Sequence, residues 1–427
     1  MPSRFQKSIY SLLALLLALF FLGNLDVQII SPILPSLRDS FNISVLFAGF
    51  SVSAYSFSGA FWALIIGPLS DRFGRIIFLR IAAICFSIAS AIAFFASEFG
   101  FFILARVLAG FAGGTFTACI IAQVADLFPY GRRGRAMGLV GGVYSLAVVV
   151  GLPVGAFVAS NGGWRSIYLF FCFTALIMAA LLSRKYQGIA TTQRELINPS
   201  KKKNGRQKRG IRKATGQQIV EYLHFWANGK TRNGLLLAIA IATTLTSLMT
   251  YLSVWLVDKF KLQDVDFALV FLAIGLSLVV GSVCGGFLAD KLGKRALVTS
   301  SSIIVAAVLL TTSLVQSLVG VYLFCIAGGL FIALRQGPYE ALLTELVPSQ
   351  QRGAYIAMRS TTAKLAIAAA AAIAGFLFQI SGFSAVTAFA SVTSLIAAGL
   401  THFSLHIEHP SQNAAVFEQD VSAESEI

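Results

Sequence analysis

Long apolar stretches alternate with short polar segments along almost the whole chain. Twelve such stretches can be marked, with bounds near 9–31, 46–69, 76–97, 100–125, 136–159, 164–183, 234–257, 267–289, 296–316, 318–344, 354–379 and 382–406. Each is long enough to cross a bilayer as a helix, which takes about 20 apolar residues. The pattern predicts an all-α membrane protein with twelve transmembrane helices.

The composition agrees with this pattern. Hydrophobic residues make up 57% of the 427 positions and charged residues 12%, roughly half the charged share of a soluble domain. These values exclude an ordinary soluble enzyme, a disordered chain and a secreted disulfide scaffold. The five cysteines lie singly within apolar stretches and form no CxxC pair, which favours buried thiols. We therefore expect no metal site and no cofactor.

The distribution of basic residues predicts the orientation in the membrane. Apart from the four basic residues deep inside the spans, 25 basic residues fall on one side and four on the other. Because basic loops stay in the cytoplasm, both termini and the central segment are expected there. This bias accounts for the net charge of +15 without a nucleic-acid partner. The first apolar stretch is too long for a usual signal peptide and is interpreted as a spanning helix.

A polar segment divides the spans into six and six, and it carries thirteen Lys or Arg residues. Within it, residues 216–228 could form a short amphipathic helix on the membrane surface. The predicted organisation is an N-terminal six-helix bundle, a basic cytoplasmic linker, a C-terminal six-helix bundle and an acidic cytoplasmic tail. These regions are residues 1–183, 184–233, 234–406 and 407–427.

The two halves are related by an internal repeat at an offset of 219 residues. Three groups recur at this offset: Gly67, Asp71 and Gly74 as Gly286, Asp290 and Gly293; Gly110 as Gly329; and Asp126, Pro129, Arg133 and Gly134 as Glu345, Pro348, Arg352 and Gly353. A parallel duplication of this kind implies a pseudo-twofold axis along the membrane normal.

Three motifs resemble those of the major facilitator superfamily. The sequence GPLSDRFGR at 67–75 resembles motif A, with Ile76 where a second basic residue is usual. Arg106, followed by Gly110, Gly113 and Gly114, resembles the span-4 motif with an arginine inside the membrane. Residues 151–155 (GLPVG) resemble the span-5 antiporter motif, although G-x-P-x-G replaces its G-P. This variant is more similar to the drug:proton antiporter and sugar-efflux branch.

Motif A and its repeat predict a gate at the cytoplasmic side. The glycines allow close helix approach and a sharp turn, and Asp71 can bind the N-terminus of a neighbouring helix. The resemblance places that neighbour at the start of span 11, while Arg72 and Arg75 could pair with Asp126. The candidate gate residues are Gly67, Asp71, Arg72, Gly74, Arg75, Asp126, Asp290 and Glu345. The alternative is a basic loop that only sets topology.

The span-5 motif has two interpretations. Gly151 and Gly155 could serve close helix packing, or together with Pro153 they could form a hinge. The second half has alanines at 368–372 in the matching place and no proline, which argues against a hinge in both halves.

Six charged residues lie inside predicted spans: Asp26, Arg106, Arg335, Glu340, Arg359 and Lys364. Each is a functional candidate, because an unpaired charge in the membrane costs several kcal/mol. At about 1.5 Å per residue, Asp26 and Arg106 lie about 7 and 9 Å from the outer ends of their spans, so they could pair. By the resemblance, both spans line the central cavity. Glu340 and Arg359 match in depth near the inner side, whereas Arg335 and Lys364 lie near mid-membrane without an obvious acidic partner.

Two mechanisms follow from these charges. Burial favours a protonated Asp26 whereas Arg106 favours its carboxylate, so a small change in geometry could switch its protonation and couple transport to protons. Alternatively, Arg335 and Lys364 could bind a carboxylate or phosphate. Otherwise the charges are structural pairs that fix helix register. The predicted substrate cavity comprises Gln28, Tyr55, Tyr144, Arg335, Gln336, Glu340, Arg359 and Lys364.

The leading hypothesis is a secondary transporter that moves a small organic solute or drug by alternating access, through proton-coupled efflux. The runner-up is proton- or anion-coupled uptake or exchange of an organic anion. An intramembrane enzyme would need a nucleophile–base pair or metal ligands at membrane depth, and the sequence has no motif for either. A non-transporting scaffold would not need intramembrane charges. No Walker A segment is present, so ATP is not the driver. We expect a monomer in a bacterial inner membrane, with protons, a small solute and lipid as partners.

Overall fold

The computed structural model describes residues 4–182 except 129 and 162, then 186, 188 and 222–404 except 263, 349 and 350. The first six helices are α1 (Arg4–Phe41), α2 (Val45–Phe73), α3 (Arg75–Phe95), α4 (Phe99–Leu127), α5 (Tyr130–Asn161) and α6 (Arg165–Leu181). The later elements are α10 (Gly229–Phe260), α11 (Asp264–Leu292), α12 (Lys294–Leu310), η1 (Thr311–Leu314), α13 (Leu318–Glu345), α14 (Arg352–Gly399) and η2 (Leu400–Ser404). The predicted linker and tail lie mostly outside the described residues.

The helices correspond to the predicted spans. In the described part of the chain, ten helices are long and apolar enough to cross a membrane, and α6 is a shorter apolar helix. Helix α14 contains the last two predicted spans, which meet at Gly382, where φ is 71° and the helical geometry is broken. Helix α1 differs most from its prediction, because it continues through Pro32 and Pro35 to Phe41.

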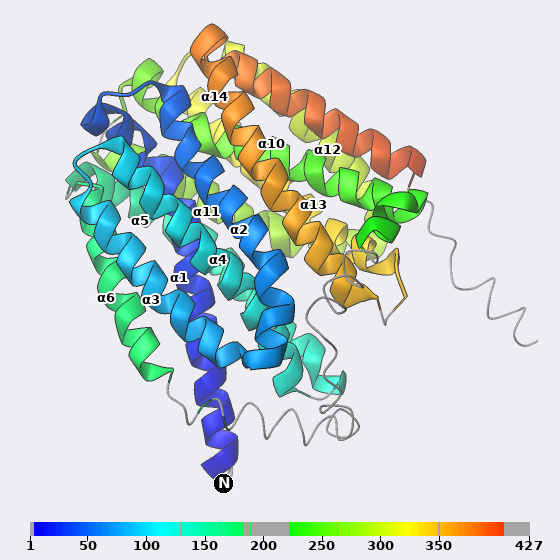
Figure 1. Cartoon of the computed structure of the whole chain (residues 1–427). Helices are drawn as coiled ribbons and strands as arrows, with labels where there is room; N and C mark the ends of the chain where they lie inside the picture. Colours follow the sequence, from blue (N-terminus) through cyan, green and yellow to red (C-terminus); the bar gives the residue numbers. More distant parts are fainter. Residues whose placement is uncertain are drawn as a thin grey trace, which may run out of the picture.

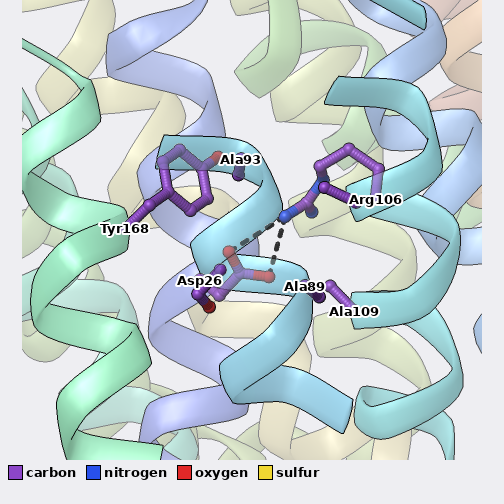
Figure 2. A pocket seen from close by; sticks show the side chains of 8 residues that line it. Asp26, Ala89, Ala93, Arg106, Ala109 and Tyr168 are labelled. Carbon is purple, nitrogen blue, oxygen red and sulfur yellow. Dashed lines mark hydrogen bonds and ion pairs between the residues drawn. The ribbon is translucent and has the colours of Figure 1, made fainter. Parts of the chain in front are cut away.

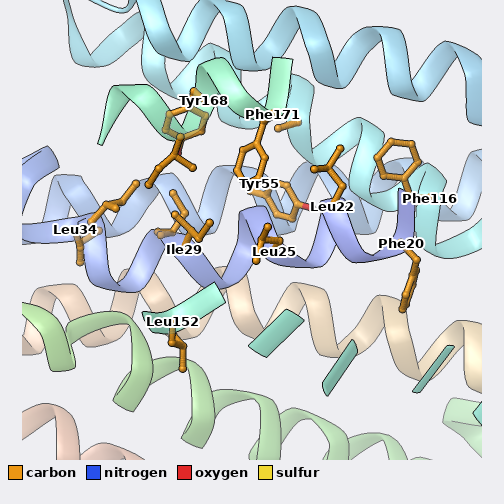
Figure 3. Packing of buried hydrophobic residues seen from close by; sticks show 14 of the residues in the cluster. Phe20, Leu22, Leu25, Ile29, Leu34, Tyr55, Phe116, Leu152, Tyr168 and Phe171 are labelled. Carbon is orange, nitrogen blue, oxygen red and sulfur yellow. The ribbon is translucent and has the colours of Figure 1, made fainter. Parts of the chain in front are cut away.

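Helices pack mainly within their own half of the chain (Figure 1). In the first half α1 packs on α5, α2 on α4, and α3 on α4 and α6; in the second half α10 packs on α14, α11 on α13, and α12 on both α13 and α14. Apolar side chains such as Leu25, Tyr55 and Phe116 fill the space around α1 (Figure 3).

The repeated Gly110 and Gly329 lie where helices approach closely. A Cβ on Gly110 would lie 2.3 Å from the Tyr55 carbonyl oxygen on α2, and one on Gly329 would lie 2.2 Å from the Ser277 hydroxyl on α11. The same helix pair, α2 with α4 or α11 with α13, is involved in each half. The repeat therefore preserves a close helix contact at the same place in each half, and at Gly110 the opposing atom is a backbone carbonyl oxygen, which leaves room only for glycine.

The two halves meet through α1–α10, α2–α14 and α5–α11. We call the end of the bundle with the 72–75 and 291–295 turns the basic-loop end, and the opposite end the far end. Three hydroxyl-to-carbonyl hydrogen bonds join the halves on the far-end side of the interface: Ser31 to Met249, Ser253 to Ser31 (2.5 Å) and Ser53 to Ala368 (2.7 Å). Arg38 adds a bidentate ion pair with Asp258, at 2.8 and 2.9 Å.

The halves separate toward the basic-loop end. Among the described residues, α4 and α5 are not packed against α13 there. A Cβ built on Gly67, Gly138 or Gly142 would meet no atom within 4 Å. The polar contacts between the described parts of the two halves thus lie toward the far end, and we call the far end closed and the basic-loop end open.

Candidate functional site

The first site is an ion pair buried in the first half (Figure 2). Arg106 NH1 on α4 lies 2.9 Å from both carboxylate oxygens of Asp26 on α1, and each residue is 1% exposed. The predicted pairing is therefore observed. Helix α1 runs ten residues beyond its predicted end near Ser31. The predicted distance of about 7 Å from Asp26 to the outer end of its span is therefore an underestimate, although the pair still forms.

Helix α2 supports the arginine of this pair. The Arg106 guanidinium carbon lies 4.5 Å from the centre of the Tyr55 ring, and its Nε donates to the Ser51 carbonyl at 3.5 Å. Tyr55 is 7% exposed, and its hydroxyl donates to the Gly23 carbonyl at 3.4 Å. Tyr55 was predicted to line the substrate cavity, but the structure places it against the ion pair inside the first half.

The surroundings explain why the pair does not face the space between the halves. It is enclosed by α3, α4 and α6, with Tyr168 on α6 opposite the carboxylate (Figure 2). The remaining lining residues are small: Ala89, Ser90, Ala93, Ala105 and Ala109. The crevice is too narrow for a water molecule. The pair thus faces the inside of the first half, although α1 and α4 also reach the interface through α10 and Lys364, since a sequence gives depth but not the facing side.

A second polar group lies between the halves and consists of five predicted cavity residues. Arg359 NH1 on α14 lies 2.7 Å from Glu340 on α13, and Gln336 donates to Glu340 at 3.3 Å. The Tyr144 hydroxyl on α5 is hydrogen-bonded with Gln28 on α1, and the charges of Glu340 and Arg359 act on it. We call these five residues the inter-half cluster.

The inter-half cluster is accessible from the open end. The side chain of Glu340 is 41% exposed and that of Arg359 is 17% exposed, while Tyr144 is 39% exposed. Tyr339, which the sequence analysis left out of the cavity, accepts a hydrogen bond from Arg359 at 3.3 Å. The sequence does place this tyrosine among the aromatic and amide residues around the intramembrane charges, but its depth did not favour a position in the cavity. The cluster offers amide, hydroxyl and charged groups to a solute from both halves.

The two remaining charges do not form one anion site. Arg335 is 0% exposed and donates from NH1 to Ser302 (2.9 Å) and Ser394 (3.1 Å), inside the second half. Lys364 instead crosses the interface, with its Nζ 3.4 Å from the Thr117 hydroxyl on α4. Both lie at similar predicted depth, but they face different neighbours, so a shared site for one anion is not observed.

The predicted gate residues form matched ion pairs at the basic-loop end. Arg75 lies 2.8 Å from Asp126, and the repeat-related Lys294 is paired with Glu345. Gly74 and its repeat Gly293 have φ of 100° and 84° at the predicted sharp turns. Each pair joins consecutive spans within one half.

Other gate predictions have a different outcome. Arg72, expected to pair with Asp126, lies over the Phe73 ring at 5.3 Å. The Asp71 side chain lies outside the described residues, so its contact with span 11 stays a prediction. Asp290 is exposed.

The span-5 glycines pack against α1. A Cβ on Gly155 would lie 2.8 Å from the Pro32 ring, and one on Gly151 would lie 3.0 Å from Gln28 Cβ. Helix α5 is continuous through Pro153. The contacts account for both glycines by close packing, and the hinge stays a prediction.

This arrangement defines a multi-pass membrane protein with two helical halves around a polar interface. The family signature of the Major Facilitator Superfamily matches residues 16–339 and 235–423. The chain belongs to the Major Facilitator Superfamily, whose members are membrane transporters for small molecules and not enzymes.

Similar proteins agree with this assignment. The uncharacterized MFS-type transporter YceJ of Bacillus subtilis (strain 168) is 24% identical over 387 residues, which are 90% of this chain and 93% of that protein. Efflux pump dotC of Dothistroma septosporum is 35% identical over 155 residues, which are 36% of this chain and 26% of the pump.

Solved structures share the fold. The crystal structure of a D-xylose-proton symporter superposes with a TM-score of 0.75 at 20% identity and covers 94% of this chain and 98% of that one. A bacterial homologue of the human lysosomal transporter Spinster, in an inward-facing and occupied conformation, gives a TM-score of 0.72 at 14% identity. This match covers 92% of this chain and 96% of that one.

Proposed function

We propose that the protein is a proton-coupled secondary transporter that exports a small organic solute by alternating access. The positive charge of its loops supports a cytoplasmic basic-loop end. In that orientation the described conformation is open to the cytoplasm and closed to the outside. The buried Asp26–Arg106 pair is the observation that carries the proton coupling.

Asp26 is suited to exchange a proton because its charge has one close partner in a dry environment. When the carboxylate is charged, it holds Arg106 by two hydrogen bonds. A proton on Asp26 removes its negative charge and so weakens its hold on Arg106. The Arg106 guanidinium then keeps its contacts with the Tyr55 ring and the Ser51 carbonyl on α2. Protonation would therefore change how α1, α2 and α4 pack, since charge-assisted hydrogen bonds are stronger than neutral ones.

The same helices form the closed far end, which gives a route from proton to gate. Asp26 and Ser31 both lie on α1, and Ser31 bonds with α10. Tyr55 and Ser53 both lie on α2, and Ser53 bonds with α14. A change at the ion pair would thus act on two helices that hold the halves together.

The inter-half cluster is the proposed solute site. It draws residues from both halves, so rocking of one half against the other would change its access. Its opening toward the basic-loop end allows solute to enter from the cytoplasm. The similarity to a protein named as an efflux pump supports the outward direction.

Proton-coupled transport can be tested in proteoliposomes with a proton-sensitive dye inside and an imposed pH gradient. We would add cationic drugs, sugars, organic phosphates and carboxylates, and compare wild type with Asp26→Asn. The control is Asp39→Asn, an exposed carboxylate on the same helix. We expect solute-dependent proton flux in wild type and control but not in Asp26→Asn. Solute movement with no accompanying proton flux in the wild-type protein would refute proton coupling.

Uptake or exchange of an organic anion is a second candidate. Lys364 favours it, because this cation faces the other half without an acidic partner among the described ion pairs. The proteoliposome assay above distinguishes export from uptake when the same solutes are tested with the pH gradient reversed.

A further inference from the structure

Lys364 is the unmatched charge at the interface of the two halves. It lies on α14 and is half-buried, with its ammonium 3.4 Å from the Thr117 hydroxyl on α4. Gly59 on α2 lies beside it, because a Cβ built there would be 3.8 Å from Nζ, an ordinary van der Waals contact. The lysine of one half thus reaches into the groove between two helices of the other.

Its position along the interface matches a solute site. The contact of Ser53 with Ala368 lies one helical turn further toward the far end on α14. Arg359 of the inter-half cluster lies five residues closer to the basic-loop end on the same helix. Lys364 therefore lies between the closed part of the interface and the open cluster.

The other intramembrane charges do not neutralise Lys364. Asp26 pairs with Arg106 and Glu340 pairs with Arg359, so each pair carries no net charge. Within the described residues, the interface thus has one excess positive charge at Lys364. An isolated ammonium at this depth is costly, which favours an anionic ligand beside it.

We propose that Lys364 and Thr117 bind a carboxylate or phosphate group of the solute, so the substrate is an organic anion. The Lys364 ammonium has three protons, so it can donate to an anionic group while it also donates to Thr117. The Thr117 hydroxyl donates to the Gly113 carbonyl at 2.8 Å, and by turning about its C–O bond it can donate to the same anionic group instead. Tyr144, which is 39% exposed between the halves, offers aromatic surface for the apolar part of the solute. This inference rests on the proposed transport function and specifies its substrate class.

The test compares three probes that share one ring system: 2-naphthoate, its neutral amide and 2-naphthylmethylamine. Binding is measured by equilibrium dialysis with the purified full-length protein in detergent. We expect wild type to bind the carboxylate at least about tenfold more tightly than the amide, as charge-assisted hydrogen bonds imply. A wild-type protein with no preference for the carboxylate overturns the proposal.

Variants show whether Lys364 causes the tighter binding of the carboxylate than of the amide. Lys364→Gln should abolish this preference, and Lys364→Arg should retain most of it. Lys259→Gln is the matched control, because that lysine donates to the Val315 carbonyl at the far end. Thr117→Val should weaken carboxylate binding by about three- to tenfold. Thermal unfolding checks that each variant is folded, and a preference that persists in folded Lys364→Gln refutes the site.

The proton assay separates this inference from the proposed function. Carboxylate binding that depends on Lys364, without solute-dependent proton flux, would keep the anion site and refute proton coupling. Proton flux that depends on Asp26, with equal binding of the carboxylate and amide, would keep coupling and refute the anion site.

Discussion

Three serine hydroxyls at the far end should control which conformation the protein prefers. Ser31, Ser53 and Ser253 each donate to a backbone carbonyl of the other half. The acceptor carbonyls remain when serine is replaced by alanine, so each substitution removes one hydrogen bond. Opening the far end must break all three bonds, because they join α1 to α10 and α2 to α14.

The expected size follows from hydrogen bonds measured between membrane helices, which average about 0.6 kcal/mol. The triple alanine variant should therefore lose about 1.8 kcal/mol of the stabilisation specific to the closed far end. This corresponds to a change of about 20-fold in the equilibrium between the two conformations. Ser31 and Ser253 are neighbours in the contact, so their single effects need not add to the triple effect.

Spin-label distances can report this equilibrium. Labels on cysteines at Phe95 and Leu314, in a background without the five native cysteines, lie at exposed far-end positions in different halves. We expect the triple variant to populate a longer distance than wild type.

The matched control for this experiment is Ser391→Ala. The Ser391 hydroxyl donates to the Ala306 carbonyl at 3.0 Å, but both residues belong to the second half. An unchanged distance distribution in the triple variant, or an equal shift in the control, would refute the gating role.

Further predictions concern stability, measured by thermal unfolding in detergent. Asp26→Ala or Arg106→Ala alone should cost about 3–5 kcal/mol because it leaves a buried unpaired charge, whereas the double variant should be less destabilised than either. A double variant no more stable than the single ones would contradict this. Gly110→Ala should cost about 1–3 kcal/mol through its clash with the Tyr55 carbonyl, and Gly142→Ala, with no neighbour, should not. Gly382→Ala should cost about 1–3 kcal/mol because of its positive φ, and an unchanged melting temperature would refute this.

The spans and the repeat could be predicted from the sequence because the bilayer imposes a strong and simple pattern. Every backbone group within the membrane must be satisfied by helix hydrogen bonds, so each crossing needs an unbroken apolar stretch. The turns at Gly74 and Gly293 followed from the repeat, and both have the positive φ that favours glycine. The end of α1 was missed because Pro32 and Pro35 usually end a helix, whereas here the helix continues through them.

The facing side of each helix could not be predicted in the same way. Residue counts give depth at about 1.5 Å per residue, but they do not fix the rotation of a helix against its neighbours. Arg335 and Glu340 lie five residues apart on α13, yet one is sealed against Ser302 and Ser394 while the other reaches the open interface. The prediction that Tyr55 lines the substrate cavity failed for the same reason, because its ring faces Arg106 inside the first half.

The repeat preserves packing and loop contacts but not the intramembrane charges. Arg75 and Asp126 recur as the pair Lys294 and Glu345. In contrast, each of the six intramembrane charges has an uncharged counterpart: Asp26 and Arg106 match Leu245 and Cys325, while Arg335, Glu340, Arg359 and Lys364 match Phe116, Ile121, Val140 and Ser145.

This asymmetry supports a division of roles between halves that share one architecture. The buried pair that we propose to exchange a proton lies entirely in the first half, and the charges that we propose to contact a solute at the interface come from the second. Coupling would then require a structural link across the interface, and α1 and α2 supply it through their contacts with α10 and α14. A variant that weakens those contacts should therefore loosen coupling without altering either site.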